Sequence, residues 1–312
     1  MPQRKKIALI GAGNIGGELA QMAARRELGD VVLLDIPEKA DVAKGKALDL
    51  SQSCALDGVD AEITGTGDYA DIQGASVCIV TAGVPRKPGM SRDDLLSINL
   101  KIIRAVAEGI KKYAPEAFVI VISNPLDAMV FEMQKVTGFP HKRVCGMAGM
   151  LDSARFQHFI VDHLKVSPKE VNVLVLGGHG DTMVPALSYC TVNGIPVGDL
   201  IDAETLQAMV ERTKMGGGEI VKLMGTSAYV APAAGAVAMA ESYLKAQNRL
   251  IPCAAYLTGQ YGQEGIYMGV PCIVGAEGVE KVVEIKLTED ERAKLDKSAS
   301  HVKELLEAAS KA

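Results

Sequence analysis

Residues 6–17 read KIALIGAGNIGG. The apolar run KIALI predicts a buried strand, and the spacing of apolar residues over 14–27 predicts that a helix follows at once. Between them GAGNIG matches G-x-G-x-x-G in its strand–turn–helix context. Gly11 permits the tight turn, Gly13 lets a pyrophosphate approach the backbone, and Gly16 lets helix and strand pack closely. The stretch therefore predicts a dinucleotide-binding parallel sheet.

This turn and the acid that follows it are the candidate cofactor site. Its candidate residues are Gly11, Ala12, Gly13, Asn14, Ile15 and Gly16, where free N–H groups at a helix start suit phosphates. Asp35 comes 19 residues after Gly16, at the end of the next predicted strand, where an acid accepts hydrogen bonds from ribose hydroxyls. Its carboxylate would repel a 2′-phosphate, so NAD is favoured over NADP. The alternative is an aspartate that only caps a turn.

The first half of the chain alternates apolar runs with helical patterns. The further runs that read as strands are 30–36, 75–83, 117–125 and 143–149, and 92–114 has helical spacing. Near-continuous apolar strands separated by helices indicate a parallel sheet that is covered on both faces. We therefore predict an α/β fold in which residues 1–149 form a doubly wound, Rossmann-type NAD-binding domain.

Residues 150–312 differ in pattern and predict an α+β substrate domain. The expected elements are a helix over 150–165, a strand over 171–176, a helical stretch over about 214–248 and an antiparallel meander over 260–287. Pro232 is expected to bend the long helical stretch. Asn193-Gly194 predicts a type I′ hairpin turn, and Thr288 with Glu291 predicts a capping box that starts the last helix.

Composition narrows the classes of partner. The 312 residues carry a net charge of −5 and a pI of about 5.6, which gives no general attraction to nucleic acid or anionic membrane. No apolar run approaches the roughly 18 residues of a membrane span. Six cysteines are scattered without a C-x-x-C pair, several within apolar runs. We therefore expect buried reduced thiols, no metal site, no nucleic-acid or membrane partner, and a cytoplasmic protein.

Two polar segments are expected at the carboxyl ends of the strands, where open α/β sheets bind ligands. The loop 83–94 carries Arg86 and Arg92 among Gly and Pro residues, a composition that suits a lid. A solvated basic loop is the alternative. Asn124 follows a predicted buried strand in Ser123-Asn124-Pro125, where it could equally be a plain turn former.

Two further candidates lie in the second half. Asp152 and Arg155 share one face of a predicted helix at i, i+3 spacing, which also suits a simple ion pair. His179 lies in GGHGD directly after an apolar run. An imidazole titrates near neutral pH and suits acid–base chemistry. The alternative is that His179 is a loop histidine without a function.

Taken together, five segments resemble the lactate/malate dehydrogenase family. They are GAGNIGG (11–17), AGVPRKPGMSRDDLL (82–96), ISNPLD (122–127), LDSARF (151–156) and GGHGDTMVP (177–185), in this order. The likeness extends over essentially the whole chain and is greatest to the bacterial lactate-dehydrogenase-like malate dehydrogenases. It implies NAD-dependent, reversible oxidation of (S)-malate to oxaloacetate.

The resemblance also implies roles for the candidate residues. His179 would be the acid/base and Asp152 its partner, Arg155 would bind the C1 carboxylate, and Arg92 would polarise the C2 oxygen. Arg86 would bind the second carboxylate. Asn124 would bridge substrate and cofactor, while Asn99, Ile122 and Ser123 would line the nicotinamide side.

The sequence is also compatible with two alternative functions. L-lactate dehydrogenases of the family usually have glutamine at the position of Arg86. A catalytically idle NAD-binding regulatory protein could share the fold, although such a protein should have lost at least one of His179, Asp152 and Arg155. The family further implies a homo-oligomer, and we expect a tetramer rather than a dimer.

Overall fold

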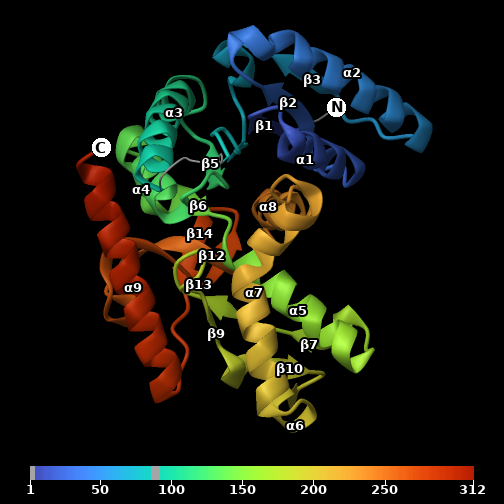
Figure 1. The fold of residues 1–312 in the computed structure, drawn as a ribbon. Helices are drawn as coiled ribbons and strands as arrows, with labels where there is room; N and C mark the ends of the chain where they lie inside the picture. Colours follow the sequence, from blue (N-terminus) through green and yellow to red (C-terminus); the bar gives the residue numbers. More distant parts are fainter. Residues whose placement is uncertain (1–3, 86–91) are drawn as a thin grey trace.

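The structure is a computed structural model that describes residues 4–85 and 92–312, with Arg92 described by its backbone alone. Among these residues, nine strands form one sheet in the order β14-β13-β12-β6-β5-β4-β1-β2-β3 (Figure 1). The strands of the first half are β1 (Lys6–Ile10), β2 (Asp30–Leu34), β3 (Ile63–Thr66), β4 (Val77–Val80), β5 (Phe118–Val121) and β6 (Val144–Gly146). All of their pairings with one another are parallel. The predicted doubly wound sheet is confirmed.

Helices cover both faces of this sheet (Figure 1). The α-helices of the described residues are α1 (Asn14–Arg25), α2 (Ala40–Asp57), α3 (Arg92–Tyr113), α4 (Leu126–Thr137), α5 (Gly149–Leu164), α6 (Val197–Leu200), α7 (Ala203–Met224), α8 (Val230–Leu244) and α9 (Glu289–Ser310). Ile7 and Leu9 of β1 belong to the core under α1, α2 and α8. Ala8 and Ile10 belong to the core under α3 and α4. Alternate side chains of one strand thus fill two separate cores.

The second half extends the same sheet. β12 (Arg249–Thr258), β13 (Glu264–Gly275) and β14 (Gly278–Val282) form the antiparallel meander, and β12 pairs with β6 through Ala254 and Gly146. β12 contains Pro252 and was not predicted from the sequence. This residue faces Pro271 of β13, and proline normally argues against a central strand.

Two expectations for the second half are wrong in detail. The stretch 171–176 is two short strands, because β7 (Val171–Asn172) pairs with β10 (Thr191–Val192) while β8 (Val175–Leu176) pairs with β9 (Val184–Pro185). Pro232 does not bend a helix. Gly225 ends α7 in the left-handed conformation, with φ +72°, and Pro232 lies in the first turn of α8, where its missing N–H costs no hydrogen bond.

The predicted hairpin and the predicted buried, free thiols are confirmed. Asn193 and Gly194 have φ values of 46° and 83° between β10 and β11 (Ile195–Pro196), which pair as a hairpin. Each of the six cysteines is buried and has a free thiol. In the described part of the chain, no helix combines the length and the apolar character that crossing a membrane requires.

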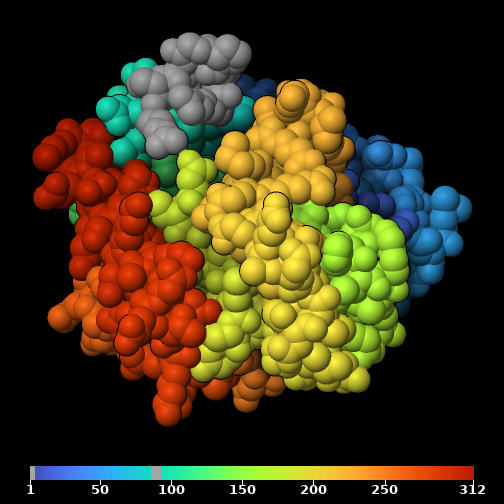
Figure 2. Space-filling model, turned by 60° about the horizontal axis from the view of Figure 1, so that its bottom comes forward, coloured from blue at the N-terminus to red at the C-terminus, as the bar shows by residue number. Residues whose placement is uncertain are grey.

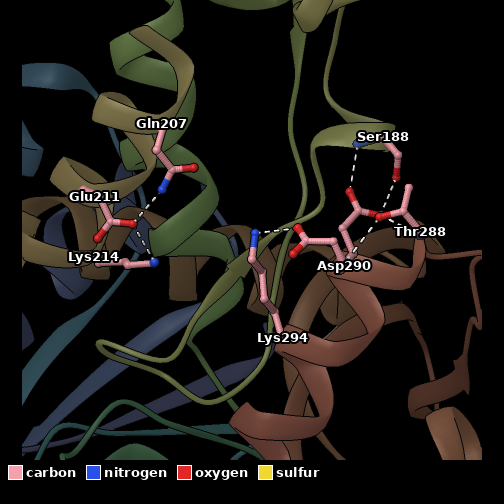
Figure 3. A network of polar contacts seen from close by, with 8 residues as sticks. Ser188, Gln207, Glu211, Lys214, Thr288, Asp290 and Lys294 are labelled. Carbon is pink, nitrogen blue, oxygen red and sulfur yellow. Dashed lines mark hydrogen bonds and ion pairs between the residues drawn. The ribbon is translucent and has the colours of Figure 1, made fainter. Parts of the chain in front are cut away.

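The last helix, α9, is tied to the rest of the second half at its first turn. The Thr288 hydroxyl accepts the Glu291 N–H at 3.2 Å, and the Glu291 carboxylate accepts the Thr288 N–H at 3.0 Å, as the capping box predicts. The same carboxylate accepts the N–H and the hydroxyl of Ser188 (Figure 3). Burial opposes its ionisation, yet these hydrogen bonds lower the pKa of Glu291.

α9 packs along one side of the second half. In the space-filling view, the red α9 and the yellow α7 lie on either side of yellow-green segments that come from the middle of the chain (Figure 2). Side chains from α9 also reach the loop that follows β8, because Ser298 contacts Gly178.

Thr288→Val tests the value of this cap. Loss of the hydroxyl leaves the Glu291 N–H without its acceptor, and we expect a loss of about 1 kcal/mol in the free energy of unfolding. Urea unfolding followed by circular dichroism measures it. Thr288→Ser keeps an acceptor and should unfold close to the wild type; equal losses in both variants would argue against the cap.

Candidate functional site

The Gly-rich turn lies at the carboxyl end of β1, beside the ends of β2 and β4. Gly11 has φ +112°, and a Cβ there would lie 2.5 Å from the Thr81 hydroxyl. A Cβ at Gly16 would lie 2.1 Å from the Gly11 carbonyl oxygen, so the helix packs against the turn as predicted. At Gly13, the N-cap of α1, a Cβ would meet no described atom within 4 Å. The backbone here is open to a ligand.

The Asp35 carboxylate lies against this turn. It accepts the N–H of Ala12 and that of Ile36, each at 2.9 Å. The alternative interpretation, a turn-capping aspartate, therefore describes part of what Asp35 does, and the same bonds hold it next to the open backbone.

Lys46 of α2 is a residue that sequence reasoning missed. Its ammonium donates to the carbonyl oxygens of Ala12 and Gly13 at 2.8 and 2.7 Å. Burial lowers the pKa of Lys46, and the neighbouring Asp35 acts in the opposite direction. Lys46 belongs to no recognised motif, so the sequence alone gave no indication of its contact with the Gly-rich turn.

Polar side chains also join the segments after β4 and β5. The Ser123 hydroxyl donates to the Ala82 carbonyl at 2.6 Å. The Asn99 side chain of α3 accepts the Val84 N–H at 2.9 Å and donates to the Asn124 carbonyl at 2.7 Å. Asn99 and Ser123 are buried, as is Ile122, whereas Asn124 is exposed. These residues set the shape of the strand edge next to the Gly-rich turn.

Asp152, Arg155 and His179 come together on the second half. β6 leads directly into α5, which places Asp152 in the first turn of that helix. Its Oδ2 lies 2.8 Å from His179 Nδ1, and its Oδ1 accepts Arg155 Nη1 at 3.2 Å. The i, i+3 ion pair therefore exists, but Asp152 is 2 % exposed, so this is no simple surface pair.

The surroundings of His179 favour its protonated form. Burial opposes the charge, and so does Arg155, yet the Asp152 carboxylate, its hydrogen bond and the more distant Asp127 outweigh them and raise the pKa of His179. An imidazole held by a carboxylate at one nitrogen can take up and release a proton at the other. This arrangement is suited to acid–base chemistry.

The His179 loop is held by three successive main-chain N–H groups. Gly177 pairs with Gly269 of β13 at 2.9 Å, the Gly178 N–H donates to Ser298 of α9 at 2.9 Å, and the His179 N–H donates to Asp127 Oδ2 of α4 at 3.0 Å. Asp127 was also missed, although it ends the segment ISNPLD. Burial raises the pKa of its carboxyl to about 7, despite the opposing effect of His179.

The structure does not describe the side chains of the two arginines of the predicted lid. Arg86 lies outside the described residues, and Arg92 begins α3 with its side chain outside them. A cavity of about 660 Å³, lined among others by Lys5, Ser76 and Tyr243, lies at the amino ends of the parallel strands. The cavity therefore lies at the opposite end of these strands from the Gly-rich turn and His179.

Comparison with known proteins agrees with this geometry. Residues 5–146 match the NAD binding domain of lactate/malate dehydrogenases, and residues 149–312 match their alpha/beta C-terminal domain. The chain belongs to the lactate/malate dehydrogenase family. It is 63 % identical over 302 residues to a curated malate dehydrogenase of Sorangium cellulosum, covering 97 % of this chain and 96 % of that one.

Solved structures of both activities share the fold. The chain is similar to a malate dehydrogenase of Cryptosporidium parvum, with 45 % identity, coverage of 99 % and 100 %, and a TM-score of 0.96. It is equally similar to a lactate dehydrogenase of the same organism, solved with lactic acid and NAD, with 46 % identity, full coverage of both chains and a TM-score of 0.96. The fold therefore does not separate the two activities.

The family and the geometry agree on the cofactor, which is NAD. The open backbone at Gly13 and the start of α1 fit a pyrophosphate. The Asp35 carboxylate beside them fits a ribose with two free hydroxyls.

His179 gives a first test that needs no substrate. We expect NMR titration to show a pKa above the ordinary histidine value in the wild type. In Asp152→Asn the pKa should fall, because the carboxylate that favours the imidazolium is lost while burial remains. His179→Asn identifies the resonance by its disappearance. An unchanged pKa in Asp152→Asn would contradict the pairing.

Asp35 gives a second test. We expect the wild type to bind NADH far more tightly than NADPH, and Asp35→Ser to narrow this ratio, because repulsion of the 2′-phosphate is relieved while ribose hydrogen bonds are lost. Fluorescence titration with both cofactors measures the two dissociation constants. Asp30→Ser, a change at the amino end of the same strand, is the control. A ratio that is unaltered in Asp35→Ser would place Asp35 away from the ribose.

Proposed function

We propose that this protein is an NAD-dependent malate dehydrogenase that interconverts (S)-malate and oxaloacetate. The observation that carries the dehydrogenase chemistry is the buried Asp152, which contacts both His179 and Arg155. An idle relative would not need to keep all three residues in contact. Bound NAD supplies the hydride acceptor.

In malate oxidation, His179 acts as the base. Its Nε2 takes the proton of the C2 hydroxyl as hydride leaves the carbon, and Asp152 stabilises the imidazolium that forms. In the reverse direction the imidazolium protonates the carbonyl oxygen. Arg155 binds the C1 carboxylate with its planar guanidinium, and Arg92 polarises the C2 oxygen as charge develops there. Asn124 bridges substrate and cofactor.

We assign cofactor contacts to the strand edge of the first half. Gly11, Ala12, Gly13, Asn14, Ile15 and Gly16 hold the pyrophosphate, Asp35 holds the ribose, and Asn99, Ile122, Ser123 and Asn124 border the nicotinamide. In this proposal residues 1–149 are the NAD-binding domain and residues 150–312 are the substrate domain. Ser123 and Asn99 act mainly through the segments they fix, since their side chains already bind carbonyl and N–H groups of the protein.

Malate is favoured over lactate by two observations. The Sorangium relative named a malate dehydrogenase is 63 % identical over nearly the whole chain. In addition, Arg86 brings a positive charge beyond those of Arg155 and Arg92. An enclosed guanidinium without an anion is costly, and a second carboxylate on the substrate supplies that anion.

We further propose that the protein is a cytoplasmic homotetramer. Large apolar side chains are exposed on α2 and α7, among them Leu48, Leu56, Met215 and Leu223. Exposed apolar residues that gather on one element mark association surfaces. The sizes of a tetramer and a dimer differ enough for sedimentation equilibrium to decide between them.

Substrate preference tests the malate assignment. Leaving one buried charge unpaired costs about 3–5 kcal/mol, and tenfold in rate or affinity is about 1.4 kcal/mol. We therefore expect kcat/KM for oxaloacetate to exceed that for pyruvate by roughly two to three and a half decades. Loss of NADH absorbance with each substrate measures the ratio.

Two variants separate substrate choice from chemistry. Arg86→Gln should lose most oxaloacetate activity and gain pyruvate activity, because the charge that selects the second carboxylate is removed. Arg155→Gln should lose both activities. If the wild type reduced both substrates equally, or if Arg86→Gln left their ratio unchanged, the malate assignment would fail and the dehydrogenase assignment would stand.

A further inference from the structure

A second buried carboxylate, Asp127, lies against the His179 loop. It occupies the first turn of α4 and is 4 % exposed. Its Oδ2 accepts the His179 N–H at 3.0 Å, while Oδ1 has no hydrogen-bond partner among the described residues. Within these residues, no lysine or arginine donates a hydrogen bond to it. Asp152 differs from it, because both of its oxygens are partnered by potential cations.

The hydrogen bond to His179 does not by itself require a charge. An asparagine has the same shape, and its amide oxygen would accept the same N–H. Burying an ionised carboxylate costs more than burying an amide, and burial accordingly raises the pKa of Asp127 to about 7. A carboxylate at position 127 is therefore less favourable for folding than an amide would be. The packing of the loop does not require its negative charge.

The charge acts on the imidazole. Asp127 from α4 and Asp152 from α5 both favour protonated His179, while Arg155, also from α5, disfavours it. Asp152 in turn opposes ionisation of Asp127, and His179 favours it. α9 contributes Ser298 at this point, which is neutral and holds the preceding N–H.

Gly178 allows Asp127 to come this close. A Cβ at residue 178 would lie 2.8 Å from Val302 Cγ2 of α9 and 3.3 Å from Asp127 Oδ2. A side chain there would push the loop away from α4 or α9. The first of these distances is shorter than real Cβ contacts, so Val302 or the loop would have to shift, and the loop is packed closely between the two helices.

We propose that Asp127 is a positioning residue for the proton transfer, fixing the His179 main chain and supplying a second negative charge that helps to keep a proton on the imidazole. The proposal rests on the proposed malate dehydrogenase function. Asp127 acts through His179. The hydrogen bond between them joins the first half of the chain to the second.

Asp127→Asn removes the charge and keeps the hydrogen-bond acceptor. Malate oxidation needs neutral His179, so kcat/KM rises with pH as the imidazolium loses its proton. Without the Asp127 charge the imidazolium is less favoured, and we expect the midpoint of this rise to move to lower pH by about half a unit or more. The dissociation constant for NADH should stay within about twofold, since the hydrogen bond of Asp127 goes to the His179 N–H and not to the Gly-rich turn. The pH profile and a fluorescence titration measure these effects.

Stability supplies a readout that a purely structural residue would not give. Because burial raises the pKa of Asp127, the folded protein binds its proton more tightly than the unfolded chain. Stability is therefore fully present at low pH and falls as pH rises from about 4 to about 7. A neutral asparagine avoids this loss, so Asp127→Asn should melt at the same or a higher temperature than the wild type at pH 8. A merely structural carboxylate predicts a lower melting temperature.

Ser298→Ala is the matched control, because it removes the neighbouring acceptor of the loop without changing charge. We expect it to lower kcat modestly and to leave the pH midpoint in place. If Asp127→Asn does not fold, Asp127→Ser also removes the charge and retains an oxygen. An unmoved midpoint in the asparagine or serine variant, or an equal movement in Ser298→Ala, would overturn the proposal.

NMR titration of His179 distinguishes this proposal from the proposed function. If the wild type does not oxidise malate, the proposed function fails, yet the pKa of His179 in Asp127→Asn still reports whether the charge acts on the imidazole. A lower His179 pKa in the variant supports the electrostatic coupling. An equal His179 pKa in variant and wild type overturns it whatever the substrate is.

Discussion

The buried carboxylate of Asp152 is the constraint on which the second half of the molecule depends. Burying a carboxylate that is 2 % exposed costs much less when it is hydrogen-bonded and lies beside positive charge. Arg155 supplies one partner from the next turn of the same helix, and His179 supplies the other from a distant loop. The helix and the loop must therefore keep a fixed relative position for the imidazole to have a defined basicity.

The loop meets this requirement through its backbone. The N–H groups of Gly177, Gly178 and His179 donate in succession to β13, α9 and α4. These three elements come from both halves of the chain, and two of them are formed by residues near its end. The histidine lies in the middle of the sequence, and its position depends on segments on both sides of it.

The sheet explains why the cofactor edge and the acid–base pair adjoin. β6 is the last parallel strand, and the chain passes from it directly into α5 and Asp152. On its other side β6 pairs with β12, which continues the sheet into the second half. In the proposed function, α5 and the His179 loop carry the chemistry on the substrate, while the ends of β1, β4 and β5 hold the dinucleotide. In the same proposal Arg86 selects the substrate, which would allow malate and lactate enzymes to share one fold.

The features that could be predicted from the sequence are local ones. The Gly-rich turn, Asp35 after its strand, the Asn193-Gly194 hairpin and the Thr288 cap each depend on neighbours a few residues away, and short-range sterics and hydrogen bonding fix them. The family's five segments added His179, Asp152 and Arg155, but their spacing alone could not bring the histidine to the helix.

Contacts between distant segments are visible only in the folded chain. β12 pairs with β6 despite Pro252, because partners far along the chain supply the hydrogen bonds that outweigh local preference. Lys46 binds the Gly-rich turn across 34 residues, and Asp127 reaches His179 across 52. A single charged residue carries no periodicity and no motif, so its role becomes visible only when folding places its partner beside it and removes water from both.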